Sequence, residues 1–280
     1  MNCVVKAVKR IDQIYCQMES VGDVNKLYYL FANTLGFPEA WPPTDKKSYY
    51  GGGVYTGNTW LKWTTFNTKT YQMTDKPAKF RSISLEPRGY EQCLKELEKR
   101  GIKMEYDGAA TIADQSGREQ EWARDSSFTG SPFKEVNLFV CKYTPVAFSA
   151  LTTTPDAKNL EEHYEAMGKR LDAVYGGPLG VRYVKEVEVG VTNLVRGMAG
   201  WQALLNPIKP AGEVWKVGNG PALRLTRGEE SCIKSISVRI KSLRRAKKFL
   251  KMNGLLGEER EYMLTLNRKK VNDLDIRFIK

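Results

Sequence analysis

The sequence predicts an α+β fold made of four similar modules, each with a strand, a helix and then further strands, a plan denoted βαβββ. Two observations support this prediction. Four amphipathic helices each follow a segment in which apolar and polar residues alternate, as in a half-buried strand. Each helix is ended by a nearby glycine or proline, and short alternating segments come next. Helices that alternate with groups of strands are typical of mixed sheets with helices packed on one face.

The first module begins with an alternating strand over 9–18, which leads into a helix over 21–35. Apolar residues in this helix recur three and four positions apart and form one stripe. Gly36 follows as the predicted helix end, because glycine accepts a left-handed backbone. Strands are predicted at 52–56 and 60–66.

The second module repeats this order. A strand over 79–85 precedes a helix over 89–100, and Gly101 ends that helix. Strands are predicted at 122–128 and 136–143. The interval from the middle of the first strand to the glycine is similar in both modules.

The third module has a strand over 181–191, and Thr192 or Asn193 is the candidate N-cap of its helix. Pro207 ends that helix. Its predicted apolar stripe contains Val195, Met198, Trp201 and Leu205, and strands are predicted at 213–217 and 222–227.

The fourth module has a strand over 232–240 and a helix over 243–253, which Gly254 ends. Strands are predicted at 262–267 and 274–279. The first strands of the second and fourth modules both contain Ser-Ile-Ser, a further sign of internal repetition.

A connector separates the two pairs of modules. It opens with a polar, proline-containing stretch and then carries a predicted helix over 160–175. The predicted organisation is a first domain at 1–146 (modules 1–76 and 77–146), a connector at 147–180, and a second domain at 181–280 (modules 181–230 and 231–280).

Two long segments, 38–48 and 109–121, read as loops. They could cover a binding site, as lids do, or be plain surface loops. The glycine run at 51–53 precedes no helix, so it is interpreted as the start of a strand or a bulge rather than as a phosphate loop.

Length and composition fit a globular protein of about two domains. Of 280 residues, 41% are hydrophobic and 27% are charged. The first residues lack the apolar stretch of a signal peptide, and no segment approaches the roughly 18 apolar residues that cross a bilayer. We therefore expect a cytoplasmic protein without a membrane partner.

The formal charge is +12 and the isoelectric point is about 9.4. Such a charge could bind nucleic acid, an anionic membrane or an anionic small ligand. The basic residues are spread along the chain. The densest cluster, at 244–251, lies on an amphipathic helix and is interpreted as its solvated face. This pattern argues against a nucleic-acid partner.

The cysteines predict neither a disulfide framework nor a zinc site, because their number is odd and no Cys-x-x-Cys occurs. We expect most of them to be small buried apolar residues. They are Cys3, Cys16, Cys93, Cys141 and Cys232.

Five stretches carry a resemblance to a known family. They are IDQIYCQM…FANTLGF (11–37), GNTWLKW (57–63), FRSISLE…LEKRGI (80–102), WKVGNGPALRL (215–225) and IKSISVRI…FLKMNGL (233–255). In order and spacing the chain resembles the vicinal-oxygen-chelate superfamily of glyoxalases, bleomycin resistance proteins and extradiol dioxygenases. The resemblance implies two glyoxalase-like domains, each with a curved mixed sheet that forms a cup around a ligand or metal.

Metal-using members of this superfamily supply His, Gln or Glu ligands from the first and last strands of paired modules. In the first module the resemblance puts these positions at Gln13 and Lys62. In the second module it puts them at Ser82 and at Phe139 or Asn137.

In the third and fourth modules the same positions fall on Glu186 and Arg224, and on Ser235 and Arg277. A divalent cation needs three or more His or carboxylate ligands, and lysine or arginine would repel it. The single histidine, His163, lies in the connector helix, so one chain lacks the two histidines of an iron facial triad. We expect no metal and no cofactor, and a solvated His163 paired with a carboxylate.

Positive side chains would instead give the cups an affinity for an anion. Lys62, Arg224 and Arg277 could bind a carboxylate or phosphate there. Trp60 lies two residues from Lys62 and shares its face, whereas Trp63 faces the other side, and aromatic walls suit a planar ligand. The alternative is that strand alternation puts these side chains on the outer, solvated face.

The resulting hypothesis is metal-independent binding of a small, planar or anionic organic ligand, with the first cup as the preferred site. One alternative is a glyoxalase-, lyase- or dioxygenase-like enzyme with a noncanonical or misplaced metal site, in which Asp12, Glu186 or nearby tyrosines do acid–base work. Another is a structural or regulatory partner protein with degenerate cups. Both a monomer and a homodimer remain open. The predicted ligand-binding residues are Gln13, Trp60, Lys62, Ser82, Phe139, Glu186, Arg224 and Arg277.

Overall fold

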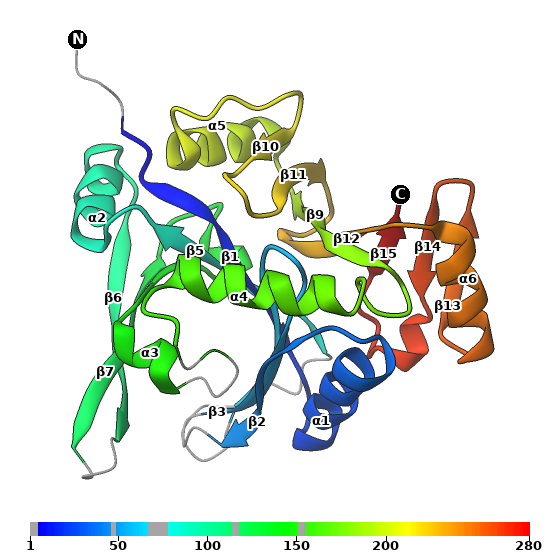
Figure 1. The fold of residues 1–280 in the computed structure, drawn as a ribbon. Helices are drawn as coiled ribbons and strands as arrows, with labels where there is room; N and C mark the ends of the chain where they lie inside the picture. The colour runs from blue at the N-terminus through cyan, green and yellow to red at the C-terminus, as the bar shows by residue number, and fades with distance from the viewer. Residues whose placement is uncertain (1–4, 46–48, 67–77, 114–117, 151–153, 155) are drawn as a thin grey trace. The chain divides into compact units, whose positions relative to one another are not determined.

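The structure is a computed structural model, and it describes residues 5–45, 49–66, 78–113, 118–150, 154 and 156–280 (Figure 1). In the first module Ser20 caps the helix, because its hydroxyl accepts a hydrogen bond from the backbone N–H of Asp23 at 3.1 Å. Gly36 has φ +72° at the predicted helix end. The elements are β1 (Val8–Gln17), α1 (Val21–Tyr29), a π-helix (Leu30–Thr34), β2 (Glu39–Asp45), β3 (Tyr49–Tyr55) and β4 (Trp60–Phe66).

The second module and the connector follow the predicted order. Gly101 has φ +72° just after the second helix, as expected of a helix-ending glycine. The elements are β5 (Lys79–Pro87), α2 (Tyr90–Lys99), β6 (Met104–Ala113), β7 (Glu119–Phe128), a 3₁₀ turn (Lys134–Val136), β8 (Leu138–Tyr143), α3 (Pro145–Ala150) and α4 (Leu160–Ala173).

The third module has two strands after its helix, where the βαβββ plan has three. Asn193 is the N-cap, since its side chain accepts from the N–H of Arg196 at 3.0 Å. The elements are β9 (Val181–Val191), α5 (Leu194–Leu205), β10 (Val214–Lys216) and β11 (Ala222–Arg227).

The fourth module returns to three strands after the helix. Its elements are β12 (Cys232–Ile240), α6 (Leu243–Met252), β13 (Leu256–Arg260), β14 (Met263–Leu266), a 3₁₀ turn (Arg268–Lys270) and β15 (Ile276–Ile279).

The strands form two mixed sheets, which confirms the predicted fold class. The first has eight strands in the order β2-β3-β4-β1-β5-β8-β7-β6, and the second has seven in the order β10-β11-β9-β12-β15-β14-β13. Parallel pairs such as β1·β4 and β12·β15 sit beside antiparallel hairpins such as β3·β4 and β13·β14. In the parallel pairs β1·β4, β5·β8 and β12·β15 the first strand of a module pairs with its last strand, so a helix lies in the connection, as parallel pairing requires.

Several expectations from the sequence were wrong. The segments 38–48 and 109–121 are not loops: Glu39–Asp45 forms β2, and much of the other lies in the β6–β7 hairpin, although 46–48 and 114–117 lie outside the described residues. Val195 is 82% exposed, because the buried stripe of α5 runs instead through Gly197, Trp201, Leu204 and Leu205.

By internal contacts the chain divides into two compact units, which are described separately. Unit 1 comprises 1–12, 82–166 and 188–233, and unit 2 comprises 13–81, 167–187 and 234–280. Unit 1 therefore holds most of the second and third modules, and unit 2 most of the first and fourth. The predicted domain boundaries are a division along the sequence and stay a prediction.

Within unit 1, Arg100 at the end of α2 holds the end of α5. Its Nη1 donates to the carbonyls of Ala203, Leu204 and Asn206 at 2.9–3.1 Å. The last carbonyls of a helix have no partner within the helix, so these bonds satisfy groups that would otherwise need solvent.

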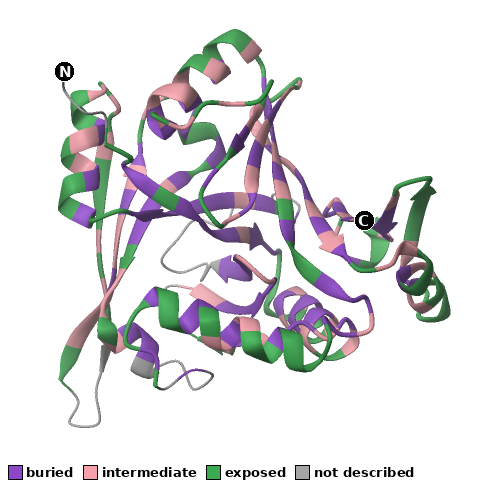
Figure 2. Cartoon of the chain, turned by 45° about the horizontal axis from the view of Figure 1, so that its top comes forward, coloured by how far each residue is buried: buried purple, intermediate pink, exposed green. Residues whose placement is uncertain are grey.

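Buried residues lie mainly on the strands and on one side of the helices (Figure 2). Cys16, Cys93 and Cys141 are buried free thiols, as expected, and Cys232 is half-buried. Cys3 lies outside the described residues. Among the described residues, no helix is long and apolar enough to cross a membrane.

Candidate functional site

Strand β4 of unit 2 has two chemically different faces, as the alternation predicts. Trp63 points to the helix side, where its ring centroid lies 4.8 Å from that of Phe31. Lys62 and Trp60 therefore share the face away from α1. On the parallel neighbour β1, Gln13 pairs with Trp60 and Tyr15 pairs with Lys62.

Lys62 is enclosed by aromatic rings on that face. Its Nζ donates to the hydroxyl of Tyr49 at 3.0 Å and lies 4.4 Å from the centroid of the same ring. The Nζ is also 4.8 Å from the ring of Tyr15 and 5.5 Å from that of Trp41. We call Lys62, Tyr15, Trp41 and Tyr49 the lysine cage, and Trp60 packs edge-on against Trp41 with centroids 5.0 Å apart.

The glycine run shapes the cage and is not a bulge in its pairing with β4. Residues 49–55 pair with 60–66 without a shift, and Gly53 lies opposite Lys62. A Cβ on Gly53 would lie 2.7 Å from Cζ2 of Trp41, and one on Gly52 would lie 2.9 Å from the backbone N of Pro43. Edge strand β2 pairs beside β3 with Trp41 opposite Gly53, and the absent side chain of Gly53 leaves room for the Trp41 ring near Lys62. The register shifts fall on the β2·β3 pair.

The electrostatics of the cage are those of a shielded cation. Lys62 is only 5% exposed, whereas the rings of Tyr15, Trp41 and Tyr49 are half-buried. Within the described residues Lys62 forms no ion pair, so aromatic faces and one phenol oxygen are its partners. Ring faces attract a cation but do not neutralise it. An anion that reached this ammonium would gain a charge-assisted hydrogen bond.

Ser82 and Phe139 lie in unit 1. The Oγ of Ser82 accepts a hydrogen bond from Nδ2 of Asn137 at 2.6 Å, and Asn137 has a left-handed backbone with φ +43°. Phe139 is half-buried and pairs with Ser84 on β5. Of the two positions considered for the β8 slot, Asn137 is the one bonded to Ser82.

The predicted residues of the second sheet are spread over both units. Arg277, in unit 2, binds Asp275 two residues earlier, with Nη2 and Oδ2 2.7 Å apart. Arg224, in unit 1, is half-buried and lies opposite Val214 on β10. In unit 2, Glu186 is half-buried and Ser235 is buried. Arg277 thus forms an ion pair with Asp275, whereas Lys62 forms none with the residues that the structure describes.

A polar network in unit 1 surrounds Asp12, which the sequence suggested only as an acid–base candidate. Asp12 has no exposed surface, and its carboxylate accepts from the hydroxyls of Tyr164 at 2.8 Å and Tyr143 at 3.1 Å. Burial raises the pKa of Asp12 to about 7, against the lowering effect of the hydroxyl of Tyr164 and the charge of Arg10. A carboxyl that titrates near neutrality can respond to physiological pH.

His163 is completely buried, which contradicts the expectation of a solvated histidine. Its Nδ1 is 2.5 Å from Oγ1 of Thr154, and its ring lies 5.9 Å from that of Phe148. The expectation failed because the helix register was judged from neighbouring glutamates, whereas α4 turns His163 and Tyr164 inward together.

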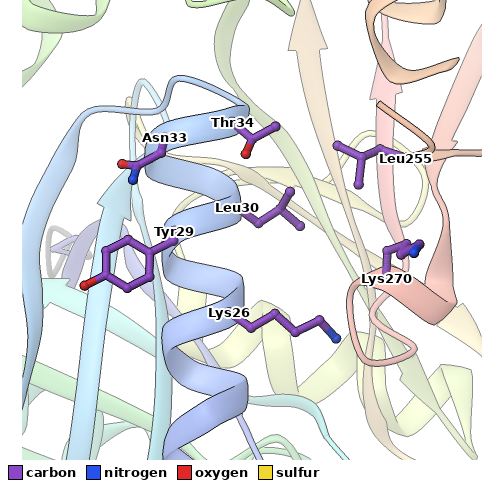
Figure 3. Close-up of a pocket in the computed structure, with 7 residues that line it drawn as sticks. All are labelled: Lys26, Tyr29, Leu30, Asn33, Thr34, Leu255 and Lys270. Carbon is purple, nitrogen blue, oxygen red and sulfur yellow. The ribbon is translucent and has the colours of Figure 1, made fainter. Parts of the chain in front are cut away.

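A shallow hollow of about 400 Å³ in unit 2 lies between α1 with its π-helix and the fourth module (Figure 3). Leu30, Lys26 and Thr34 point toward Leu255 and Lys270 across it. Lys26 is exposed and donates to Asn272 at 3.1 Å. This hollow contains no buried charged group comparable to Lys62.

The residues at the expected metal positions do not fit a divalent cation. Lys62 would repel one, Phe139 has no donor atom, and serine and glutamine are weak ligands. Among the described residues, no three His, Cys, Asp or Glu side chains lie close enough together to hold a metal ion.

Comparison with known proteins confirms the expected fold. Neither a protein-family profile nor a curated protein sequence matches the chain. Among solved structures it is similar to a hypothetical protein from Staphylococcus aureus, with TM-score 0.60, 9% identity and coverage of 96% of this chain and 98% of that one. It is also similar to homoprotocatechuate 2,3-dioxygenase from Brevibacterium fuscum in complex with 3,4-dihydroxyphenylacetate, with TM-score 0.60, 8% identity and coverage of 100% and 82%.

A further similar structure is the Mn(II)-bound glyoxalase from Novosphingobium aromaticivorans, with TM-score 0.58, 12% identity and coverage of 98% and 82%. The chain therefore has the fold of the vicinal-oxygen-chelate superfamily over its full length. At these identities the likeness concerns the fold and not the activity.

Proposed function

We propose that the chain binds a small, planar organic anion at the lysine cage without a metal ion. The observation that carries this proposal is the buried ammonium of Lys62, held among three rings and without an acidic partner in the described residues. The anion would bind to the ammonium, and its planar body would lie against the half-buried rings of Tyr15, Trp41 and Tyr49.

The location of the cage supports the same proposal. Lys62 and Gln13 stand at positions that the family resemblance assigns to metal ligands, and they share the face of the sheet away from α1. A lysine at such a position supplies the positive charge that a metal supplies in metal-using proteins. A carboxylate ligand would thus be held without any chelating residues.

Calorimetric titration with 2-naphthoate, in the presence of EDTA, tests the proposal. This probe is planar and anionic and has no neighbouring oxygens with which to chelate a metal. Lys62→Met should weaken binding by about tenfold to a hundredfold, since it removes a hydrogen bond between charged groups. The neutral 2-naphthamide should bind as weakly to the unaltered chain as 2-naphthoate binds to the variant.

Lys216→Met, at an exposed position on β10, is the matched control for the loss of one positive charge. It should leave the affinity for 2-naphthoate unchanged. Equal affinities in the Lys62 variant and the unaltered chain would show that the cage is not the binding site. Equal binding of the amide and the carboxylate would show that the anionic group is not recognised.

A further inference from the structure

A second hollow, of about 450 Å³, lies in unit 1 where the ends of β5 and β8 meet the starts of α2, α3 and α4. We call it the unit 1 hollow. Its volume lies in the range of ligand pockets in proteins. None of its lining residues belongs to the lysine cage, so a ligand here would bind independently of the proposed function.

Four charged groups at and beside the hollow neutralise one another in ion pairs. Glu86 is buried and accepts from Nε of Arg10 at 2.6 Å and from Nζ of Lys9 at 2.8 Å. Arg10 also donates to Glu161 at 2.8 Å. Two carboxylates are thus matched by two cations, and this network fixes the floor of the hollow against β1.

Three further basic residues line the hollow: Arg88, Lys142 and Lys158. All three are exposed, and none forms an ion pair with any residue that the structure describes. Basic groups gathered at the rim of one concavity raise the local concentration of anions. Three cations without carboxylate partners suit a doubly charged group better than a singly charged one.

The walls of the hollow are aromatic and apolar. Tyr90 and Phe148 are buried, and the half-buried ring of Tyr143 lies 6.0 Å from that of Phe148. The hydroxyls of both tyrosines are already engaged, that of Tyr143 with Asp12 and that of Tyr90 with Ser126 at 2.6 Å. These bonds fix the rings while parts of them line the hollow, as a stacking surface for a planar ligand requires.

We propose that the unit 1 hollow binds a small molecule that joins a planar ring to a phosphate group. The ring would lie against the half-buried Tyr143, which Phe148 backs, and the phosphate would lie among Arg88, Lys142 and Lys158. Lysine binds phosphate as a point charge, so no bidentate geometry is needed.

Isothermal titration calorimetry with phenyl phosphate tests this site. The double variant Lys142→Met/Lys158→Met should bind phenyl phosphate about threefold to tenfold more weakly than the unaltered chain, because two exposed phosphate contacts are lost. The double variant Lys185→Met/Lys216→Met, at two exposed positions outside the hollow, is the control for total charge and should bind as the unaltered chain does.

Ligand controls separate the two halves of the proposal. Inorganic phosphate and benzoate should each bind about tenfold more weakly than phenyl phosphate, since one lacks the ring and the other has a single charge. If inorganic phosphate binds equally well, the ring surface is wrong, and if benzoate does, the phosphate assignment is wrong.

The Lys62→Met variant distinguishes this site from the lysine cage. Phenyl phosphate and benzoate are themselves planar anions, so the titrations that test the hollow are made on Lys62→Met. That variant should retain one phenyl phosphate site, and Lys142→Met/Lys158→Met in the same background should weaken it. If Lys62→Met abolishes phenyl phosphate binding, or if the double variant of the hollow does not weaken it, the unit 1 hollow is not the site.

Discussion

Replacement of Asp12 by asparagine tests whether the buried carboxyl of unit 1 titrates near neutrality. Its pKa in the folded chain is about 7, raised mainly by burial. In the unfolded chain an aspartate has a pKa near 4. Between about pH 4 and about pH 7 the folded state keeps a proton on Asp12 that the unfolded state has released, so the free energy of unfolding falls as pH rises. A difference of about three pKa units corresponds to roughly 4 kcal/mol at alkaline pH.

Asp12→Asn removes this titration and keeps the shape of the side chain. The amide rearranges the bonds to Tyr143 and Tyr164, which shifts stability by the same amount at every pH. The difference in unfolding free energy between variant and unaltered chain should therefore change with pH. From pH 4.5 to pH 8.5 it should move in favour of the variant by about 3 kcal/mol, because this range covers the titration from pH 4.5 to about pH 7.

Urea unfolding at pH 4.5, 6, 7 and 8.5, followed by circular dichroism, measures this difference. Other titrating groups contribute equally to both proteins and cancel. Asp172→Asn, at an exposed position on α4, should follow the unaltered chain throughout. If the Asp12 variant also runs parallel to the unaltered chain over this range, Asp12 does not titrate there and the reasoning is refuted.

Three further substitutions or labelling experiments test other parts of the structure. Gly53→Ala should push Trp41 away from Lys62. In urea unfolding it should lower stability by about 1–3 kcal/mol, and in calorimetry it should weaken 2-naphthoate binding. Gly130→Ala, with open space around its Cβ, should change neither the stability nor the binding. Arg100→Met should lower stability by about 2–4 kcal/mol because the last carbonyls of α5 lose their donor, and a loss no larger than that of the exposed Arg244→Met would contradict this role. Burial raises the pKa of the thiols of Cys16, Cys93 and Cys141, that of Cys93 to about 12. Iodoacetamide at pH 8, followed by peptide mapping, should therefore leave these thiols unlabelled until urea is added. Labelling under native conditions would show that the thiols are accessible.

Local patterns in the sequence predicted the repeated plan well. Strands β9 and β12 and the glycines after α1, α2 and α6 stand where alternation and helix-ending signals put them. These features depend on neighbouring residues, which a single sequence displays. The failure at β2 has a tertiary cause. This strand contains two adjacent prolines, and its place at the edge of a sheet, where N–H groups need no partner, makes a strand possible there.

The candidate site could be predicted only in part. The alternation of β4 placed Lys62 and Trp60 on one face, and the structure bears this out. The enclosure of Lys62 by Trp41 and Tyr49 was not predictable, because it depends on β2 pairing with β3 so that Trp41 lies opposite Gly53. The network around Asp12 was also hidden, since it joins β1 to tyrosines more than a hundred residues away.

Native mass spectrometry of the chain with 2-naphthoate tests the proposed function most directly. The chain is stripped with EDTA and then sprayed with the probe alone, or after incubation with manganese, zinc or iron. We predict a one-to-one complex with the metal-free chain, reduced in Lys62→Met and unchanged in Lys216→Met. A complex that forms only on a chain carrying one metal ion would contradict metal-independent binding at the lysine cage.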